Sequence, residues 1–215
     1  MNSKKYDLIL FDLDGTLADT VADIAFYANE ALVHFDYPTH PVSAVKRSIG
    51  WGVHELLKTL EPLLGDDPSR LDQAVELFKK NYRQKPVHET VVFEGVEETL
   101  AGPLAHTKKA VVTNKPQDIA EQILKELGLA RHFEITIGMN AGFPPKPDPT
   151  SIRHVMNLLA VVSERTVYVG DSGIDADAAK NAGVDFAWVS YGYDAPHLID
   201  PVARFSSARQ WRLLV

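Results

Sequence analysis

Hydrophobic residues recur with one pattern at residues 1–16 and 89–215 and with another at residues 17–88. In the first part, short apolar runs alternate with stretches in which apolar residues recur every three to four positions, and this predicts strands and helices in alternation. Strands are expected at 6–11, 110–113, 133–137, 167–169 and 186–189. Helices are expected at 95–100, 116–127, 150–160 and 175–181. Such alternation is typical of βαβ units around a mostly parallel sheet.

Between residues 19 and 88 the period is helical, and no strand is predicted there. Apolar residues from Val21 to Phe35 fall near one helical stripe, and further helices are expected at 41–49, 53–64 and 68–84. We therefore predict an α/β fold with a Rossmann-like, mostly parallel sheet core of residues 1–16 and 89–215. A small α-helical cap of residues 17–88 is inserted into it. Open sheets of this kind bind ligands at the carboxyl ends of their strands.

Composition and charge narrow the class of protein. The 215 residues include 22 Lys and Arg against 29 Asp and Glu, which gives a net charge of −7 and argues against a nucleic-acid partner. No apolar run approaches the roughly 20 residues that cross a bilayer, and the N-terminus lacks the pattern of a signal peptide. There is no cysteine, so disulfides and thiolate sites are excluded. We expect a cytoplasmic protein without a membrane partner, and the oligomeric state stays open.

The first group of chemically useful residues follows the first predicted strand. Asp12 and Asp14 are two positions apart, so in extended backbone they share a face. Two such carboxylates repel each other unless a proton or a metal lies between them. A turn that leaves the strand explains the Asp-Gly pair equally well when this segment is taken alone.

A second pair of carboxylates follows a later strand. Asp171 comes just after the strand at 167–169, and Asp175 lies on the first turn of the next helix, where the helix dipole favours an acidic residue in any case. Neighbouring strands lie about 5 Å apart, so we expect Asp171 to face Asp12. Carboxylates that converge in this way form a hard oxygen site suited to Mg²⁺.

Two further segments offer groups for an anion. Thr113 and Asn114 bring a hydroxyl and an amide to a strand end just before a helix, although an ordinary helix cap explains them about as well. Lys146 lies between Pro145 and Pro147, which stiffen the loop that presents its ammonium group. A solvated loop lysine is the commoner explanation for any single residue of this kind.

Together, the order and spacing of these four segments resemble the haloacid dehalogenase superfamily. Its phosphatases carry Asp-x-Asp-Gly-Thr, then Thr or Ser, then Lys, then Gly-Asp-x-x-x-Asp, and this chain has matching residues at 12–16, Thr113, Lys146 and 170–175. The resemblance implies that Asp12 is a nucleophile that forms an aspartyl-phosphate. It also implies that Asp14 first protonates the leaving group and then activates water.

The same resemblance implies a cofactor and its ligands. Mg²⁺ would be held by the Asp12 carboxylate, the Asp14 backbone carbonyl and Asp171, with Asp175 in a supporting position. The phosphoryl oxygens would be neutralised by residues of the second and third segments, namely Thr113, Asn114 and Lys146. The implied reaction is the hydrolysis of a phosphate monoester.

Shorter stretches resemble phosphoglycolate phosphatases in particular, at residues 112–116, 170–175, 178–183 and 191–193. The resemblance implies a cap that closes over the strand ends and favours a small phosphate ester, with 2-phosphoglycolate as the leading candidate. Residues 50–52 of the cap offer backbone N–H groups and an aromatic wall. Cations for a substrate carboxylate are available at Lys46, Arg47 and Lys58.

Other functions compete with this interpretation. A sugar-phosphate mutase, a nucleotidase or a pyrophosphatase of the same superfamily would use the same core residues. A serine hydrolase with Ser172 as nucleophile is a remote alternative, because Gly-x-Ser-x-Gly is broken by Ile174 and the predicted fold is not a β-barrel. A phosphate-binding module without turnover is another, and the inserted cap fits it poorly.

Overall fold

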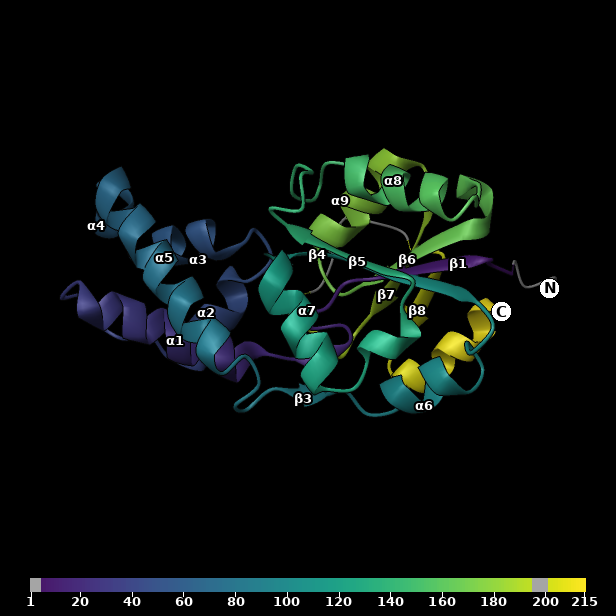
Figure 1. The fold of residues 1–215 in the computed structure, drawn as a ribbon, viewed down its shortest axis with the longest axis horizontal. Coiled ribbons are helices and arrows are strands. Elements are labelled where there is room, and N and C mark those ends of the chain that lie inside the picture. Colours follow the sequence, from purple (N-terminus) through teal and green to yellow (C-terminus); the bar gives the residue numbers. More distant parts are fainter. Residues whose placement is uncertain (1–4, 195–200) are drawn as a thin grey trace.

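A computed structural model describes residues 5–194 and 201–215, and its centre is a six-stranded sheet (Figure 1). The strand order is β5-β4-β1-β6-β7-β8, and all neighbouring strands pair in parallel. The strands are β1 Leu8–Phe11, β4 Lys108–Pro116, β5 Ile135–Met139, β6 Thr166–Gly170, β7 Asp185–Val189 and β8 Ala203–Phe205. A separate pair consists of β2 Ala18–Asp19 and β3 Val91–Val92. The predicted parallel α/β fold is confirmed.

The sheet is buried on both faces, which explains why its strands are apolar runs without alternation. In β1, Ile9 and Phe11 contribute to one core cluster, whereas Leu8 and Leu10 contribute to the other. Helices α6 and α7 and the 3₁₀ helix η3 cover the first face, and α8 and α9 cover the second (Figure 1). Their bounds are α6 Val96–Ala101, α7 Gln117–Glu126, α8 Thr150–Leu158, α9 Gly173–Ala182 and η3 Ala208–Leu214.

The remaining helices form a separate group beside the carboxyl ends of the strands (Figure 1). They are α1 Val21–His34, α2 Val42–Ser48, α3 Val53–Leu60, α4 Pro62–Gly65 and α5 Pro68–Gln84. Helices α1 and α5 pack along each other, and buried apolar side chains such as Leu32 and Phe78 hold the group together. This arrangement places a helical layer next to the edge of the sheet at which ligands bind.

One buried carboxylate fastens the chain where it returns from this helical layer. Asp23, in the first turn of α1, accepts hydrogen bonds from the backbone N–H groups of His88, Glu89 and Thr90, at 3.0, 2.8 and 3.0 Å. The Thr90 hydroxyl donates a fourth, at 2.6 Å. Next to this contact, β2 pairs with β3 in antiparallel orientation. The two chain segments that connect the helices to the sheet are therefore tied together.

The longer elements agree with expectation, but the two-residue strands β2 and β3 and the short 3₁₀ helices at Ala130–His132 and Ser163–Arg165 were not expected. Three further differences concern boundaries or whole elements. The helix expected over 53–64 is interrupted at Glu61, whose backbone leaves the helical region because Pro62 follows it. The strand expected at 110–113 extends over Lys108–Pro116. No element was expected after residue 189, where β8 and η3 form, because β8 has only three residues and an exposed Arg204 at its centre.

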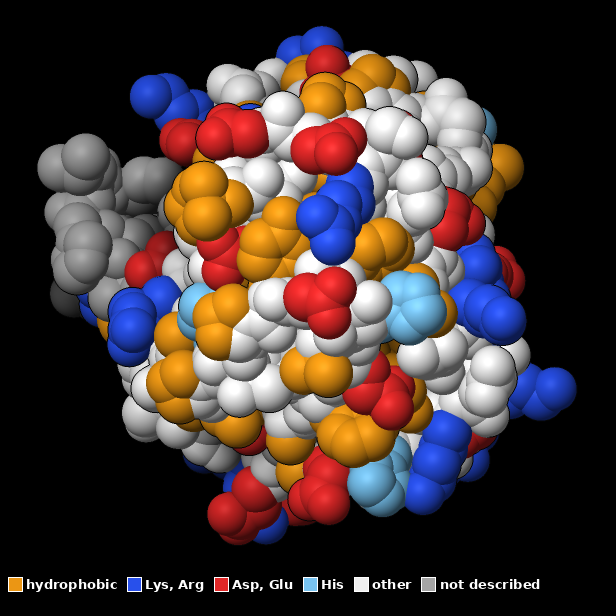
Figure 2. Space-filling view, turned by 90° about the vertical axis from the view of Figure 1, so that its left-hand side faces the viewer, with side chains coloured by type: hydrophobic (Ala, Val, Ile, Leu, Met, Phe, Trp, Pro, Cys, Tyr) orange, Lys and Arg blue, Asp and Glu red, His pale blue; other side chains and the backbone are white. Residues whose placement is uncertain are grey.

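The outer surface of the helical layer carries hydrophobic, acidic and basic side chains side by side, without a continuous basic patch on the face shown (Figure 2). Large hydrophobic residues with exposed fractions near one half or more include Phe26, Val33 and Leu63. Across residues 5–194 and 201–215, each helix is too short or too polar to span a bilayer.

Candidate active site

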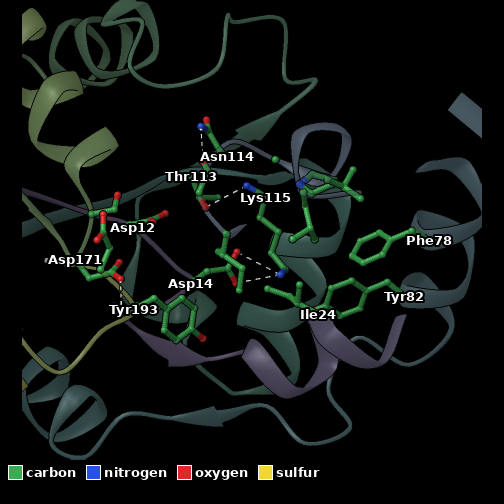
Figure 3. Close-up of a pocket in the computed structure, with 18 residues that line it drawn as sticks. Asp12, Asp14, Ile24, Phe78, Tyr82, Thr113, Asn114, Lys115, Asp171 and Tyr193 are labelled. Carbon is green, nitrogen blue, oxygen red and sulfur yellow. Dashed lines mark hydrogen bonds and ion pairs between the residues drawn. The ribbon is translucent and has the colours of Figure 1, made fainter. Parts of the chain in front are cut away.

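Three of the four predicted functional segments line one pocket between the sheet and the helical layer (Figure 3). Three strand ends contribute to it: Asp12 and Asp14 follow β1, Thr113 to Pro116 end β4, and Asp171 follows β6. Residues of the helical layer close the opposite side, among them Ile24, Gly50, Phe78 and Tyr82. Because the strands are parallel and adjacent, residues that are more than 150 positions apart in sequence become neighbours.

Three carboxylates form the innermost part of the site. Asp12, Asp171 and Asp175 each have a carboxylate oxygen within 4.8 Å of the others. All three are buried, and Asp175 has no exposed surface. Asp12 of the first acidic pair thus lies beside both carboxylates of the second pair, whereas Asp14 is not part of this cluster.

Burial and mutual repulsion disfavour the ionised forms of these carboxylates. Burial raises the pKa of Asp12 to about 6, with Asp175 and Asp14 acting in the same direction, while Lys146 and a hydrogen bond from Thr113 oppose the rise. The pKa of Asp171 is raised well above its usual value, first by burial and then by Asp175 and Asp12. A cation bound among them would reverse both effects.

Lys146 lies inside the acidic cluster rather than in solvent, with 3% of its side chain exposed. Its ammonium donates hydrogen bonds to Asp175 at 2.6 Å and to the Tyr168 hydroxyl at 2.8 Å. It also lies 3.0 Å from Asp12 Oδ1, in an orientation that makes no hydrogen bond. Burial lowers the pKa of Lys146, but Asp12 and Asp175 raise it more, and the pKa lies well above its usual value. Lys146 is therefore a fixed positive charge beside Asp12.

Asp14 faces away from this cluster, toward the helical layer (Figure 3). The Lys115 ammonium donates to its two oxygens at 3.0 and 3.4 Å, and the Thr20 hydroxyl donates to Oδ1 at 2.5 Å. The Lys115 ammonium also lies 4.6 Å from the centre of the Tyr82 ring. The two carboxylates after β1 thus have different partners, so their chemistry can differ.

Ser172 caps helix α9 together with Asp175. The Ser172 hydroxyl and backbone N–H both donate to Asp175 Oδ2, at 2.7 and 3.1 Å, and the Asp175 N–H donates back to Ser172 Oγ at 3.3 Å. This is a capping box. The hydroxyl is held by a carboxylate in a structural motif, which does not supply the base that a nucleophilic serine needs.

Thr113 and Asn114 take different positions at the end of β4. The Thr113 side chain accepts a hydrogen bond from the Lys115 N–H at 3.2 Å. The Asn114 amide donates to the carbonyls of Gly50 and Lys146, at 2.9 and 3.0 Å, and accepts from the Lys146 N–H at 2.8 Å. Asn114 therefore connects the loop of the helical layer, the end of β4 and the loop that carries Lys146.

Two glycines allow the backbone to approach Asp171 closely. Gly15 has φ of +80°, and a Cβ built there would lie 2.5 Å from Asp171 Oδ2. A Cβ on Gly192 would lie 2.2 Å from the Cβ of Asp171. Beside this contact, the Tyr193 N–H donates to Asp171 Oδ2 at 2.6 Å, and Thr16 donates to Oδ1 at 3.2 Å. Sequence reasoning gave no role to these supporting residues, although Gly15, directly after Asp14, was a signal for close packing.

The apolar side of the pocket differs from the expectation. Trp51 is 55% exposed, and the aromatic rings that line the pocket belong to Phe78, Tyr82 and Tyr193. The signal for Phe78 and Tyr82 was their spacing of four on α5, which also fits ordinary core packing. Of the cations considered for a substrate carboxylate, Lys46, Arg47 and Lys58, none is among the pocket-lining residues within the described part of the chain. Lys115 does line the pocket, although the sequence analysis did not consider it as a partner for a substrate carboxylate.

The donor set fits a divalent cation. Asp12 Oδ1 is buried without a hydrogen-bond donor, and two more carboxylates lie beside it. Buried negative charges of this kind need a paired cation, and an all-oxygen donor set suits Mg²⁺. Asp175 is paired with the Lys146 ammonium and held in the helix cap by Ser172, whereas the described partners of Asp171 are the uncharged Tyr193 N–H and Thr16 hydroxyl, so Asp171 keeps a negative charge that a cation could pair.

Comparison with known proteins adds independent findings. Residues 9–189 match the family model described as haloacid dehalogenase-like hydrolase. A phosphoglycolate phosphatase of Pseudomonas savastanoi pv. phaseolicola is 37% identical over 193 residues, which cover 87% of this chain and 70% of that protein. A plasmid-encoded phosphoglycolate phosphatase of Cupriavidus necator is 37% identical over 191 residues, covering 87% and 82%.

Solved structures agree with these relatives. A crystal structure from Haemophilus somnus, described as a predicted phosphoglycolate phosphatase, has a TM-score of 0.87 at 26% identity and covers 95% of this chain and 96% of that one. A TM-score of this size over nearly the whole of both chains shows that the two share one fold.

Proposed function

This chain belongs to the haloacid dehalogenase-like hydrolase family, and we propose that it is a Mg²⁺-dependent phosphatase that hydrolyses a small phosphate monoester, with 2-phosphoglycolate as the leading substrate. The chemistry is supported by the arrangement of the four aspartates. The substrate is supported by two relatives at 37% identity that are described as phosphoglycolate phosphatases.

In this proposal Asp12 is the nucleophile. Its Oδ1 has no hydrogen-bond donor and lies 3.0 Å from the Lys146 ammonium, beside the pocket. Attack of a carboxylate oxygen on phosphorus forms the aspartyl-phosphate and breaks the bond to the leaving oxygen. The fixed charge of Lys146 and the Thr113 hydroxyl then offset negative charge on the phosphoryl oxygens as it develops.

Asp14 is the general acid and base. It lies in the pocket beside Lys115 and the helical layer, away from the carboxylates of Asp12 and Asp171, and in this proposal the leaving oxygen lies on that side. It donates its proton to the leaving alkoxide and then removes one from the water that attacks the aspartyl-phosphate. Thr20 and Lys115 hold its carboxylate in position.

Mg²⁺ would be held by the carboxylates of Asp12 and Asp171 and by the backbone carbonyl of Asp14, with Asp175 supporting the site through Ser172 and Lys146. When bound, the ion lowers the repulsion between the phosphate dianion and the acidic cluster. For Asn114, the hydrogen bonds to Gly50 and Lys146 support a positioning role in addition to the predicted contact with phosphate.

We propose that residues 17–88 act as a cap over the pocket. The hydrogen bond from Asn114 to the Gly50 carbonyl and the apolar wall of Ile24, Phe78 and Tyr82 support this role, because they restrict the space beside Asp14. A closed cap excludes water and favours small esters. A cytoplasmic location remains part of the proposal, supported by the absence of cysteine.

The observation that carries the proposal is the buried Asp12 oxygen without a donor, which lies between a fixed lysine and two further carboxylates at the edge of a pocket. The test is a panel of 2-phosphoglycolate, glucose 6-phosphate, AMP and pyrophosphate, assayed for phosphate release with Mg²⁺ and with excess chelator. We expect the highest kcat/KM for 2-phosphoglycolate and no turnover with chelator.

Each part of the proposal can fail separately in this panel. If another ester is preferred tenfold or more, which corresponds to about 1.4 kcal/mol in transition-state free energy, the substrate assignment is wrong. If no ester releases phosphate in the presence of Mg²⁺, the phosphatase assignment is wrong. Conversion of a sugar phosphate to an isomer without phosphate release would identify a mutase.

A further inference from the structure

Lys115 is a buried cation that the reaction scheme uses only as a partner of Asp14. It lies at the end of β4 with 3% of its side chain exposed, and its side chain extends between Asp14 and the ring of Tyr82 (Figure 3). Burying an ammonium group is costly unless it is paired. In the proposed reaction Asp14 is protonated for part of the cycle, and it then no longer balances the charge of Lys115. We therefore looked for a second anionic partner of this ammonium group.

The two buried lysines of the site lie on different sides of it. The Lys146 ammonium contacts Asp12, Asp175 and Tyr168, on the side of the nucleophile. The Lys115 ammonium contacts Asp14, on the side of the leaving group. Among the pocket-lining residues that the structure describes, Lys115 is the one Lys or Arg, and apart from Asp14 its ammonium faces an aromatic ring.

The shape of this side limits what can reach Lys115. Ile24, Phe78 and Tyr82 line the pocket around it, and the Tyr82 ring covers one side of the ammonium. A leaving group that enters this space must be small. An uncharged leaving group would form no ion pair with the Lys115 ammonium. A carboxylate close to the leaving oxygen would instead pair with the buried charge, and such charge-assisted hydrogen bonds are the strong ones.

We propose that Lys115 determines substrate specificity by binding a carboxylate that the substrate carries next to its phosphorylated carbon. This inference rests on the proposed phosphatase function and deepens it, because it names the residue that distinguishes an acidic small ester from a neutral one. Lys115 shares its ammonium between the substrate carboxylate and Asp14, which places the leaving oxygen beside the general acid.

Other lysines near the pocket serve as comparisons. Lys46, on α2, has its ammonium 5.1 Å from the centre of the Tyr193 ring and is the closest rival. Lys58, on α3, is about half exposed and lies 3.8 Å from Glu55, so it represents a surface lysine of the same helical layer. Neither is among the pocket-lining residues.

The test compares two esters that differ in one group, 2-phosphoglycolate and 2-hydroxyethyl phosphate, in which CH₂OH replaces the carboxylate. The measured quantity is the ratio of their kcat/KM values in wild type and in K115M, K115R, K46M and K58M. We expect wild type to prefer the carboxylate ester by about 30-fold or more, as for a buried charge-assisted contact. In K115M the ratio falls to within about threefold of unity.

Three control variants test whether the substrate preference depends on the positive charge at position 115. K58M and K46M keep the wild-type ratio, and K115R retains a preference for the carboxylate ester because it retains the charge. Since a ratio of two substrates is compared within one variant, partial loss of folded protein does not change it. K115Q serves in place of K115M if that variant does not fold.

Three outcomes overturn the inference. An unchanged ratio in K115M and K115Q, with both esters slowed equally, would show that Lys115 only positions Asp14. Loss of the preference in K46M instead would move the carboxylate site to α2. A wild-type ratio near unity would show that no such site exists. These differ from failure of the proposed function, in which wild type with Mg²⁺ hydrolyses neither ester nor p-nitrophenyl phosphate.

Discussion

The four aspartates of the site have the same side chain but different surroundings, and these decide what each can do. Asp12 has a buried oxygen without a donor, and Asp14 is held by Lys115 and Thr20. Asp171 accepts a backbone N–H, and Asp175 is fixed in a helix cap. A nucleophile needs a free oxygen, whereas a supporting residue needs a fixed one. For this reason we propose Asp12 as the group that reacts.

The first prediction compares the two nucleophiles that the sequence offers. D12N should lower kcat by more than about 10³-fold, because the amide cannot attack phosphorus, while its fold is retained. S172A removes a helix cap and should lower kcat by less than about tenfold. Phosphate release and the unfolding free energy of both variants check this. If S172A is inactive and D12N is not, the nucleophile is Ser172.

At this scale the sequence could predict the acidic residues but not all of their partners. Asp12, Asp14, Asp171 and Asp175 follow strand ends in a recognisable order, so their convergence follows from a parallel sheet. Lys115 could not be placed in the same way. Its strand has a register shift between Val112 and Pro116, and this irregularity decides which way the residues between them point.

At the scale of elements, the connection between helical layer and sheet depends on Asp23. Four donors from residues 88–90 surround its carboxylate. Burial raises the pKa of Asp23, but these hydrogen bonds lower it more, so the pKa lies below its usual value of 3.8. The folded state therefore favours the ionised form of Asp23 and is stabilised by it.

The second prediction uses the pH dependence of this contact. D23N should lower the unfolding free energy by about 2 to 4 kcal/mol at pH 7 through unmatched buried donors. Because the folded pKa is lowered, the difference from wild type is full above the unfolded pKa, 3.8, and shrinks as pH falls through the folded value. Urea unfolding between pH 3 and 7 measures it.

A matched control for this prediction is D72N on helix α5, where the side chain is 75% exposed. It should change the unfolding free energy by less than about 0.5 kcal/mol at any of these pH values. A D23N difference that stays constant down to pH 3, or that equals the D72N difference, would contradict the assigned role of Asp23.

The bounds of helices and strands could be predicted where the hydrophobic pattern was long. The prediction was wrong where the pattern was short. The helix over Pro68–Gln84 and the strands of the sheet centre follow from periodicity and apolar runs. The break at Glu61 depends on one proline, and β8 gains its place only from pairing with β7. Such tertiary pairing leaves no local signal in three residues.

At the scale of the whole molecule, negative charge is concentrated at the proposed active site. A chain of net charge −7 has collected three buried carboxylates at the point where a phosphate must approach. Two buried lysines, on opposite sides, offset only part of this charge. A divalent cation bound among the carboxylates would offset the rest, and we therefore expect turnover to require Mg²⁺.

The most direct test is to trap the covalent intermediate. Wild-type protein, turning over the best ester of the panel with Mg²⁺, is quenched in acid and reduced with borohydride, which converts an aspartyl-phosphate into homoserine. Peptide mass spectrometry should find homoserine at position 12, and not when the ester is omitted, when Mg²⁺ is chelated or in D12N. Rapid turnover with Asp12 unmodified, or with the label at another residue, would contradict the account.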